Sequence, residues 1–116
     1  MGEPEARLPS HLEVAGLIRR AQAAGGFAAV LHKGERDAGT IVVSLTERGA
    51  PARLFERMPQ PDGSRAWALA RREDPAQPQD YSEYLARRAA QDRDLWIVEL
   101  DIADGERLIG FTPPRD

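Results

Sequence analysis

Hydrophobic and polar residues alternate most regularly over residues 91–102 of the sequence. One side of this stretch is wholly apolar and carries Trp96, Val98, Leu100 and Ile102. The other side combines Leu95 and Ile97 with two acidic residues. Because successive side chains of a strand point to opposite faces of a sheet, the pattern predicts a strand that is buried on one face and partly covered on the other. We expect Trp96 to lie in the core, between the sheet and at least one helix.

Two other stretches place apolar residues at helical spacing. The first, residues 10–24, begins with Ser10 and Glu13 in the Ser-x-x-Glu pattern of a capping box, and a Gly-Gly pair follows it as a stop. The second, residues 80–92, begins with a similar pattern, an aspartate followed three positions later by glutamate. We expect both helices to pack on the apolar face of the sheet and to leave the other face partly open.

Four further runs have the composition or the alternation of strands. They are residues 27–33, 40–47, 52–58 and 65–71. Six turn-like residues join the first two runs, which makes a hairpin the simplest interpretation, and residues 107–111 allow a short final strand. The strands come in consecutive runs rather than alternating with helices. The sequence therefore predicts an α+β fold in the order α-β-β-β-β-α-β, with a mainly antiparallel sheet of four to six strands and two helices.

The composition is that of a small globular protein. A chain of 116 residues is enough for one domain, which we assign to residues 9–111 with flexible termini at 1–8 and 112–116. The absence of cysteine excludes disulfides, thiolate metal sites and a cysteine nucleophile. The net charge of −3 gives no overall attraction to nucleic acid or to an anionic membrane. The sequence starts without a signal-type segment and has no apolar run near the ~20 residues that span a bilayer, so we expect a cytoplasmic protein.

Few residues point to catalysis or to metal binding. The two histidines, His11 and His32, have no further metal ligands at short spacing. The nearest group of carboxylates comprises Asp92, Asp94, Glu99 and Asp101. These carboxylates lie at a helix-to-strand junction and on a strand, whereas a calcium site needs oxygen ligands on one curved loop. We therefore predict no catalytic residue, no metal and no cofactor, and we favour a protein that is not an enzyme.

The first candidate for a ligand site is the loop of residues 34–39 with the lysine before it. Its candidate residues are Lys33, Gly34, Arg36, Asp37 and Gly39. The loop lacks the Gly-Lys-Ser/Thr ending of a phosphate-binding loop, and it leads into a strand rather than a helix. A hairpin turn is the better interpretation. The alternative is a small-ligand site, because two glycines let a partner approach the backbone closely.

The second candidate is a sheet face that carries arginines beside an aromatic ring. It comprises Arg53, Phe55, Arg57, Arg65 and Arg71, from two proposed neighbouring strands. Basic strands with aromatic residues are typical of proteins that bind single-stranded nucleic acid. A solvated sheet face explains the same pattern, so a nucleic-acid-binding accessory protein is an alternative and not the main interpretation.

Four segments of the chain follow the pattern of a known protein family. They are residues 17–20 (Leu-Ile-Arg-Arg), 25–28 (Gly-Gly-Phe-Ala), 33–39 (Lys-Gly-Glu-Arg-Asp-Ala-Gly) and 92–99 (Asp-Arg-Asp-Leu-Trp-Ile-Val-Glu). Together they resemble domain-of-unknown-function family 1491, a family of short bacterial proteins, over about residues 7–102. The family pattern has proline where this chain has Arg93, so a rigid turn at that junction is not implied. The family carries no established activity, and the resemblance implies a shared fold and no reaction.

The main functional hypothesis is a protein-interaction module that self-associates, with a homodimer as the expected state. A sheet that does not close on itself has two free edges, which natural proteins cover or blunt. We place these edges at residues 52–58 and 65–71. The less covered face is expected to keep Val42, Phe55, Leu95 and Ile97 available for pairing about a twofold axis. Another protein is the alternative partner, and no membrane is expected.

Overall fold

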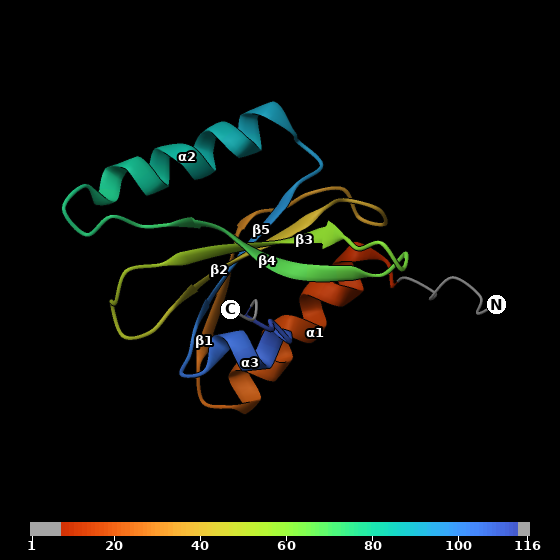
Figure 1. The fold of residues 1–116 in the computed structure, drawn as a ribbon, viewed down its shortest axis with the longest axis horizontal. Helices are drawn as coiled ribbons and strands as arrows, with labels where there is room; N and C mark the ends of the chain where they lie inside the picture. The colour runs from red at the N-terminus through yellow and green to blue at the C-terminus, as the bar shows by residue number, and fades with distance from the viewer. Residues whose placement is uncertain (1–7, 114–116) are drawn as a thin grey trace.

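The computed structural model describes residues 8–113; residues 1–7 and 114–116, most of the termini predicted to be flexible, lie outside the described residues. The elements follow in the order α1 (Ser10–Ala23), β1 (Phe27–His32), β2 (Ile41–Thr46), β3 (Arg53–Pro59), β4 (Arg65–Arg72), α2 (Pro78–Gln91), β5 (Trp96–Asp101) and α3 (Gly105–Ile109). Figure 1 shows the strands as one twisted sheet with helices on both sides. The α+β class is as predicted, since the sheet is antiparallel except for one parallel pair.

The strand order is β1-β5-β2-β3-β4, which places the last strand of the chain inside the sheet. β5 pairs antiparallel with β1 and parallel with β2. The predicted hairpin between β1 and β2 is therefore wrong. The physical reason lies in β5 itself, whose residues 96–98 are all buried, as is Leu95 just before them. A strand with apolar residues on both faces is best covered at an inner position.

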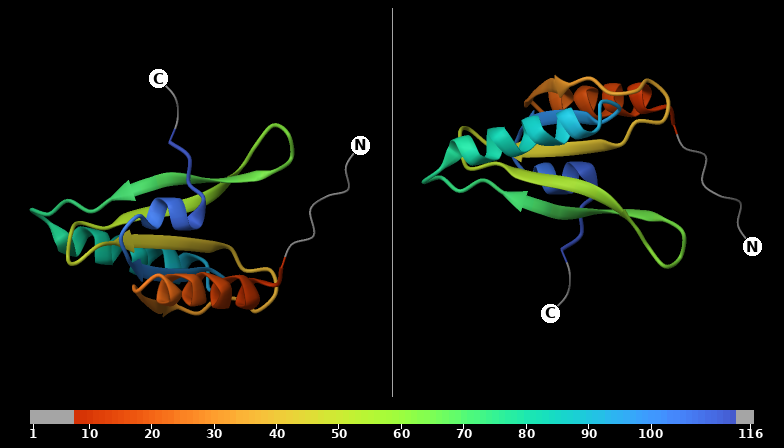
Figure 2. Two further views of the ribbon diagram at one scale, coloured as in Figure 1. Left: turned by 90° about the horizontal axis from the view of Figure 1, so that it is seen from below. Right: turned by 90° about the horizontal axis from the view of Figure 1, so that it is seen from above.

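The helices cover opposite faces of the sheet, which corrects the expectation that both pack on one face. In Figure 1, α2 lies above the sheet, and α1 and α3 lie below it. In Figure 2, α1 and α3 are nearer the viewer in the view from below, and α2 is nearer in the view from above. Trp96 is 4% exposed in the core under α1 and α3, as predicted. Leu95 and Ile97 belong to a second core under α2. Leaving such side chains in water would forfeit about 1.5–3 kcal/mol each, so the second face needed its own helix.

The segment after β5 forms the short helix α3 and not the predicted final strand. Asp104, in a left-handed conformation (φ 56°), precedes the helix, and Gly110 (φ 83°) follows it. Ile109 is 7% exposed and packs into the core that α1 also covers. Two or three apolar residues in a row fit a strand or a helix equally well, so the sequence pattern could not decide between them.

Both predicted capping boxes are wrong. α2 begins at Pro78, so the aspartate at position 80 lies inside its first turn and no side chain caps the helix. α1 begins at Ser10, with Pro9 in the N-cap position and again no side-chain cap. The first turn of α1 is satisfied by another part of the chain, the loop that the sequence marked as a candidate ligand site.

Candidate functional site

Strand β1 is one edge of the sheet, and its large apolar side chains are exposed. Phe27 is 75% exposed, Val30 41% and Leu31 48%. Gly25, in a left-handed conformation (φ 88°), ends α1 and returns the chain into this strand. No charged residue lies within residues 27–31. We call residues 27–31 the apolar edge.

Hydrogen bonds at the two ends of β5 show which of its backbone groups face each neighbouring strand. The N–H of Trp96 donates to the carbonyl of Thr40 at 2.8 Å, and the N–H of Ile102 donates to that of Thr46 at 3.0 Å. Alternate residues of a strand direct their N–H and C=O groups to the same side. The even-numbered residues of β5 therefore bond β2, and the odd-numbered residues bond β1.

The same alternation identifies the backbone groups that point away from the sheet at β1. The odd-numbered residues of β5 stand opposite Phe27 and Ala29. Phe27 and Ala29 consequently direct their N–H and C=O groups toward β5. Ala28 and Val30 direct theirs to the free edge. A bulge follows Val30, so the regular part of the edge is residues 27–30.

Exposed large apolar side chains are concentrated near this edge. Among the described residues six such side chains are exposed, and five of them belong to residues 8–31: Leu8, Leu12, Phe27, Val30 and Leu31. The sixth, Met58, lies in the β3–β4 hairpin and is 46% exposed. A scattered exposed leucine needs no explanation, but several on neighbouring elements mark a surface that suits an interaction. α1 and β1 are such neighbours.

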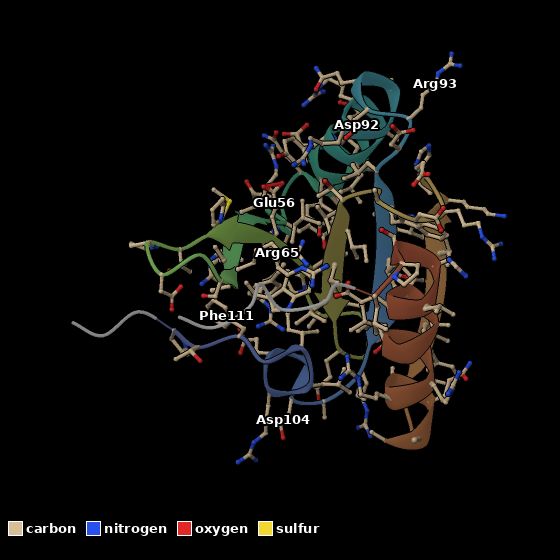
Figure 3. All side chains as sticks on the ribbon, turned by 90° about the vertical axis from the view of Figure 1, so that its right-hand side faces the viewer. Glu56, Arg65, Asp92, Arg93, Asp104 and Phe111 are labelled. Carbon is tan, nitrogen blue, oxygen red and sulfur yellow. The ribbon has the colours of Figure 1, made fainter. Side chains whose placement is uncertain are left out.

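The opposite edge of the sheet is charged. β4 forms it and carries Arg65, Arg71 and Arg72, and charged side chains of this kind blunt an edge against pairing. Figure 3 labels Arg65 on this side of the molecule. The prediction of an edge at residues 65–71 is therefore confirmed. The other predicted edge, residues 52–58, is wrong because β3 lies between β2 and β4.

The sheet face that was expected to stay open is closed. Its predicted residues Val42, Phe55, Leu95 and Ile97 are all 2% exposed or less. α2 covers three of them. Phe55 points to the other face, where the ring of Phe111 meets it edge-on with centroids 4.9 Å apart. Self-association through this face is not available, which leaves β1 as the surface to consider.

A hollow of about 450 Å³ adjoins the start of the apolar edge. It is lined by Ala24, Gly25, Gly26, Phe27, Glu47, Arg48, Asp101, Ile102 and Ala103. The backbone N–H of Arg48 donates to the carboxylate of Asp101 at 3.0 Å. The lining thus carries two carboxylates and one guanidinium. It lies where the parallel strands β2 and β5 end, beside the C-terminus of α1.

The loop of residues 34–39 caps helix α1. The N–H of Ser10 donates to the carbonyl of Asp37 at 3.0 Å, and the N–H of His11 donates to that of Arg36 at 2.9 Å. The Ser10 hydroxyl donates to the carbonyl of Gly39 at 2.6 Å. These carbonyls satisfy first-turn N–H groups that otherwise need a capping side chain. The loop therefore has a structural role, and it is not the turn of a β1–β2 hairpin.

The two glycines of this loop make room for a backbone carbonyl. A Cβ at either Gly34 or Gly39 would overlap the carbonyl oxygen of Asp94. That oxygen accepts the N–H of Glu35 at 2.9 Å. The Glu35 carboxylate accepts hydrogen bonds from the backbone N–H groups of Ala38 and Asp37. These bonds, the one from Ala38 most, lower the pKa of Glu35. Lys33, Arg36 and Asp37 remain exposed, so ligand binding by their side chains stays a prediction.

The predicted nucleic-acid residues do not share one exposed face. Phe55 is fully buried, and Arg53 and Arg57 form ion pairs with Glu106 of α3 and Glu13 of α1. The guanidinium of Arg57 lies 4.8 Å from the Trp67 ring centre on the same side. Arg71 faces the other side, 4.3 Å from the Tyr84 ring centre on α2. Pairing with carboxylates removes charge that a phosphate would need, and nucleic-acid binding stays an untested prediction.

A buried polar contact on the α2 side was not indicated by the sequence. The hydroxyl groups of Ser44 and Tyr81 lie 2.7 Å apart, and burial raises the pKa of Tyr81 to about 12. On the same side Arg88 forms an ion pair with Glu56, which Figure 3 labels. These contacts attach α2 to the sheet. The apolar edge was missed for another reason, since only the strand order reveals that β1 has a free side.

Two further kinds of feature are absent from the described part of the chain. Within residues 8–113 no group of three or more histidines, cysteines or carboxylates is placed to hold a metal ion. No helix in the same residues is long and apolar enough to cross a membrane. Asp92, Asp94, Glu99 and Asp101, considered above for a cation, are not assembled into such a group.

The fold and the edge define a small α+β domain with a mixed five-stranded sheet and one uncovered apolar strand. The family described as "Protein of unknown function (DUF1491)" matches residues 8–110. The chain belongs to this family, as the resemblance implied. No curated protein matches the chain.

Solved structures of similar proteins agree with the fold. The crystal structure of a DUF1491 family protein from Caulobacter crescentus CB15 superposes with a TM-score of 0.73 at 36% identity, covering 95% of this chain and 100% of that one. The solution structure of a protein from A. tumefaciens gives a TM-score of 0.75 at 30% identity, covering 96% of this chain and 99% of that one. The chain therefore spans the full length of these relatives, and none of their descriptions assigns a function.

Proposed function

We propose that this chain is a non-enzymatic protein-interaction module that self-associates as a homodimer through the apolar edge. The observation that carries the proposal is the exposure of Phe27, Val30 and Leu31 on an edge strand without a charged residue. Unpaired N–H and C=O groups on such a strand recruit another strand, and burial of the flanking apolar side chains adds to the affinity. The cytoplasmic location stays a prediction.

A second copy is the partner that this surface suits best. One edge strand offers the same groups to its own copy, so a twofold arrangement satisfies both surfaces at once and closes the assembly. The opposite edge, β4, carries three arginines and would repel its own copy. A homodimer through β1 therefore leaves a charged edge on each outer side, which limits further growth of the sheet.

Sedimentation equilibrium at tens of micromolar protein tests this proposal. We expect a mass of about twice the 12.8 kDa of the chain. Leu31→Lys should return the protein to the monomer mass, because it places a charge in the interface. Met58→Lys is the matched control, since Met58 is 46% exposed against 48% for Leu31 and lies far from β1 in the strand order. A single monomeric species of the unchanged protein would refute the proposal.

A backbone variant tests the pairing itself. The N–H of Ala28 points to the free edge, so Ala28→Pro removes a bond to the partner and spares those to β5. The variant is expected to remain folded and to be monomeric. Ala29→Pro is the comparison, because it removes an N–H that β5 uses and should lower the stability of the monomer as well. Dimers of undiminished affinity in Ala28→Pro would contradict strand pairing at this edge.

A further inference from the structure

We infer that the second copy lies antiparallel along β1, with the twofold axis at Ala29, and that Lys33 of each copy occupies the hollow beside Phe27 of the other. The inference rests on the proposed function and adds to it a register and a specific contact. Three features of the edge lead to it: the direction of its backbone groups, the cover on its two faces, and the place of the hollow.

The backbone directions restrict how two copies can pair. Only Ala28 and Val30 direct their N–H and C=O groups outward along the regular part of the strand, so these residues must form the ladder between copies. With the axis at Ala29, Ala28 of each copy stands opposite Val30 of the other. All four outward groups on each side then find a partner. An axis at Ala28 or at Val30 would instead set that residue against itself and place the other opposite a residue outside the regular part of the strand.

The same register brings apolar side chains together on the face that α2 leaves open. Phe27 and Ala29 share this face with Glu99 and Asp101 of β5, opposite which they stand. Among the described residues, the core under α2 includes none from β1, which accounts for the 75% exposure of Phe27. Antiparallel pairing at Ala29 sets Phe27 of one copy level with Leu31 of the other. Both rings would then be covered by a leucine.

Beyond the regular part of the strand, the register leads Lys33 of one copy toward the Gly25 end of the other copy's strand, where the hollow lies. Lys33 is the only lysine in the sequence, is exposed, and follows β1 directly. The hollow carries the carboxylates of Glu47 and Asp101 and lies beside the C-terminus of α1, whose carbonyl groups favour a cation. Its one positive group is Arg48. The two carboxylates and the helix C-terminus together outweigh the single guanidinium. The hollow is therefore net negative and favours one more positive charge.

A charge exchange between Lys33 and Glu47 tests the contact. Lys33→Glu and Glu47→Lys should each weaken dimerisation about tenfold, because the twofold axis removes two ion pairs at once. The double variant should recover the affinity to within about threefold of the unchanged protein. Arg72→Glu, on the opposite edge of the sheet, makes the same change of charge as Lys33→Glu and should leave the affinity unchanged. The measurement is the dissociation constant from sedimentation equilibrium, at low salt where the contact is strongest.

The outcomes separate this inference from the proposed function. Recovery in the double variant supports the register and the contact. A dimeric unchanged protein with no loss in either single variant, or with added losses in the double variant, overturns the inference and leaves the proposed dimer standing. A monomeric unchanged protein overturns both.

Discussion

Replacing Trp96 gives the clearest measure of how much β5 contributes to the fold. Its side chain is 4% exposed in the core under α1 and α3, and its indole N–H donates to the carbonyl of Glu35 at 2.7 Å. Trp96→Ala should cost about 3–5 kcal/mol, as other truncations of buried aromatic side chains do. Part of this cost, about 1 kcal/mol, is the lost hydrogen bond to the loop that caps α1.

Two companion variants separate the contributions. Trp96→Phe keeps most of the buried apolar area and loses the N–H, so it should cost about 1–2 kcal/mol. Trp67→Ala is the control, because Trp67 is only partly buried on the edge strand β4 and should cost about 1–2 kcal/mol. Since a domain of this size has about 5–15 kcal/mol of stability, both companion variants should still fold.

Guanidinium unfolding followed by far-ultraviolet circular dichroism measures these free energies without relying on tryptophan fluorescence. The three variants should rank with Trp96→Ala as the most destabilised. A loss below about 1 kcal/mol for Trp96→Ala, or one no larger than that of Trp67→Ala, would mean that Trp96 is not packed in the core under α1 and α3.

Three further expectations concern the loop and the buried hydroxyl groups. Gly34→Ala should lower the free energy of unfolding by about 2 kcal/mol or more in chemical denaturation, because the new Cβ would overlap a carbonyl oxygen. Gly16 in α1 has open space around it, so Gly16→Ala should stabilise the protein by about 0.5–1 kcal/mol. Ser10→Ala should lower the free energy of unfolding by about 1 kcal/mol. Ser10→Asp should lower it further, because a carboxylate would face the carbonyl of Gly39. If Ser10→Asp left the stability unchanged, the capping box would be restored as the explanation. Burial raises the pKa of Tyr81 from 10.0 to about 12. The protonated hydroxyl group of Tyr81 therefore contributes fully to the free energy of unfolding below pH 10. About 2–3 kcal/mol of this free energy is lost as the pH rises to 12. Tyr81→Phe should remove this loss in urea titrations across that range, and an unchanged pH dependence would contradict it.

Local patterns in the sequence were enough to identify most elements. The helix predicted over residues 10–24 is α1, Ser10–Ala23, and the alternation in residues 91–102 is β5. The buried position of Trp96 followed from that alternation alone. Periodicity reports which side of an element is apolar, and burial of that side is nearly obligatory. The family resemblance likewise depended on short segments that can be recognised one by one.

Tertiary structure decided which strands are neighbours, and with them the candidate site. β1 and β2 are adjacent in the sequence, but β5 separates them because its two apolar faces favour an inner position. That insertion leaves Phe27 and its neighbours at an edge, where the local pattern had placed them in a hairpin. It also moves β3 to the interior and brings α2 over Leu95 and Ile97. A strand carries its own periodicity, whereas its place in a sheet depends on how well every other strand can be covered, and that comparison involves the whole chain.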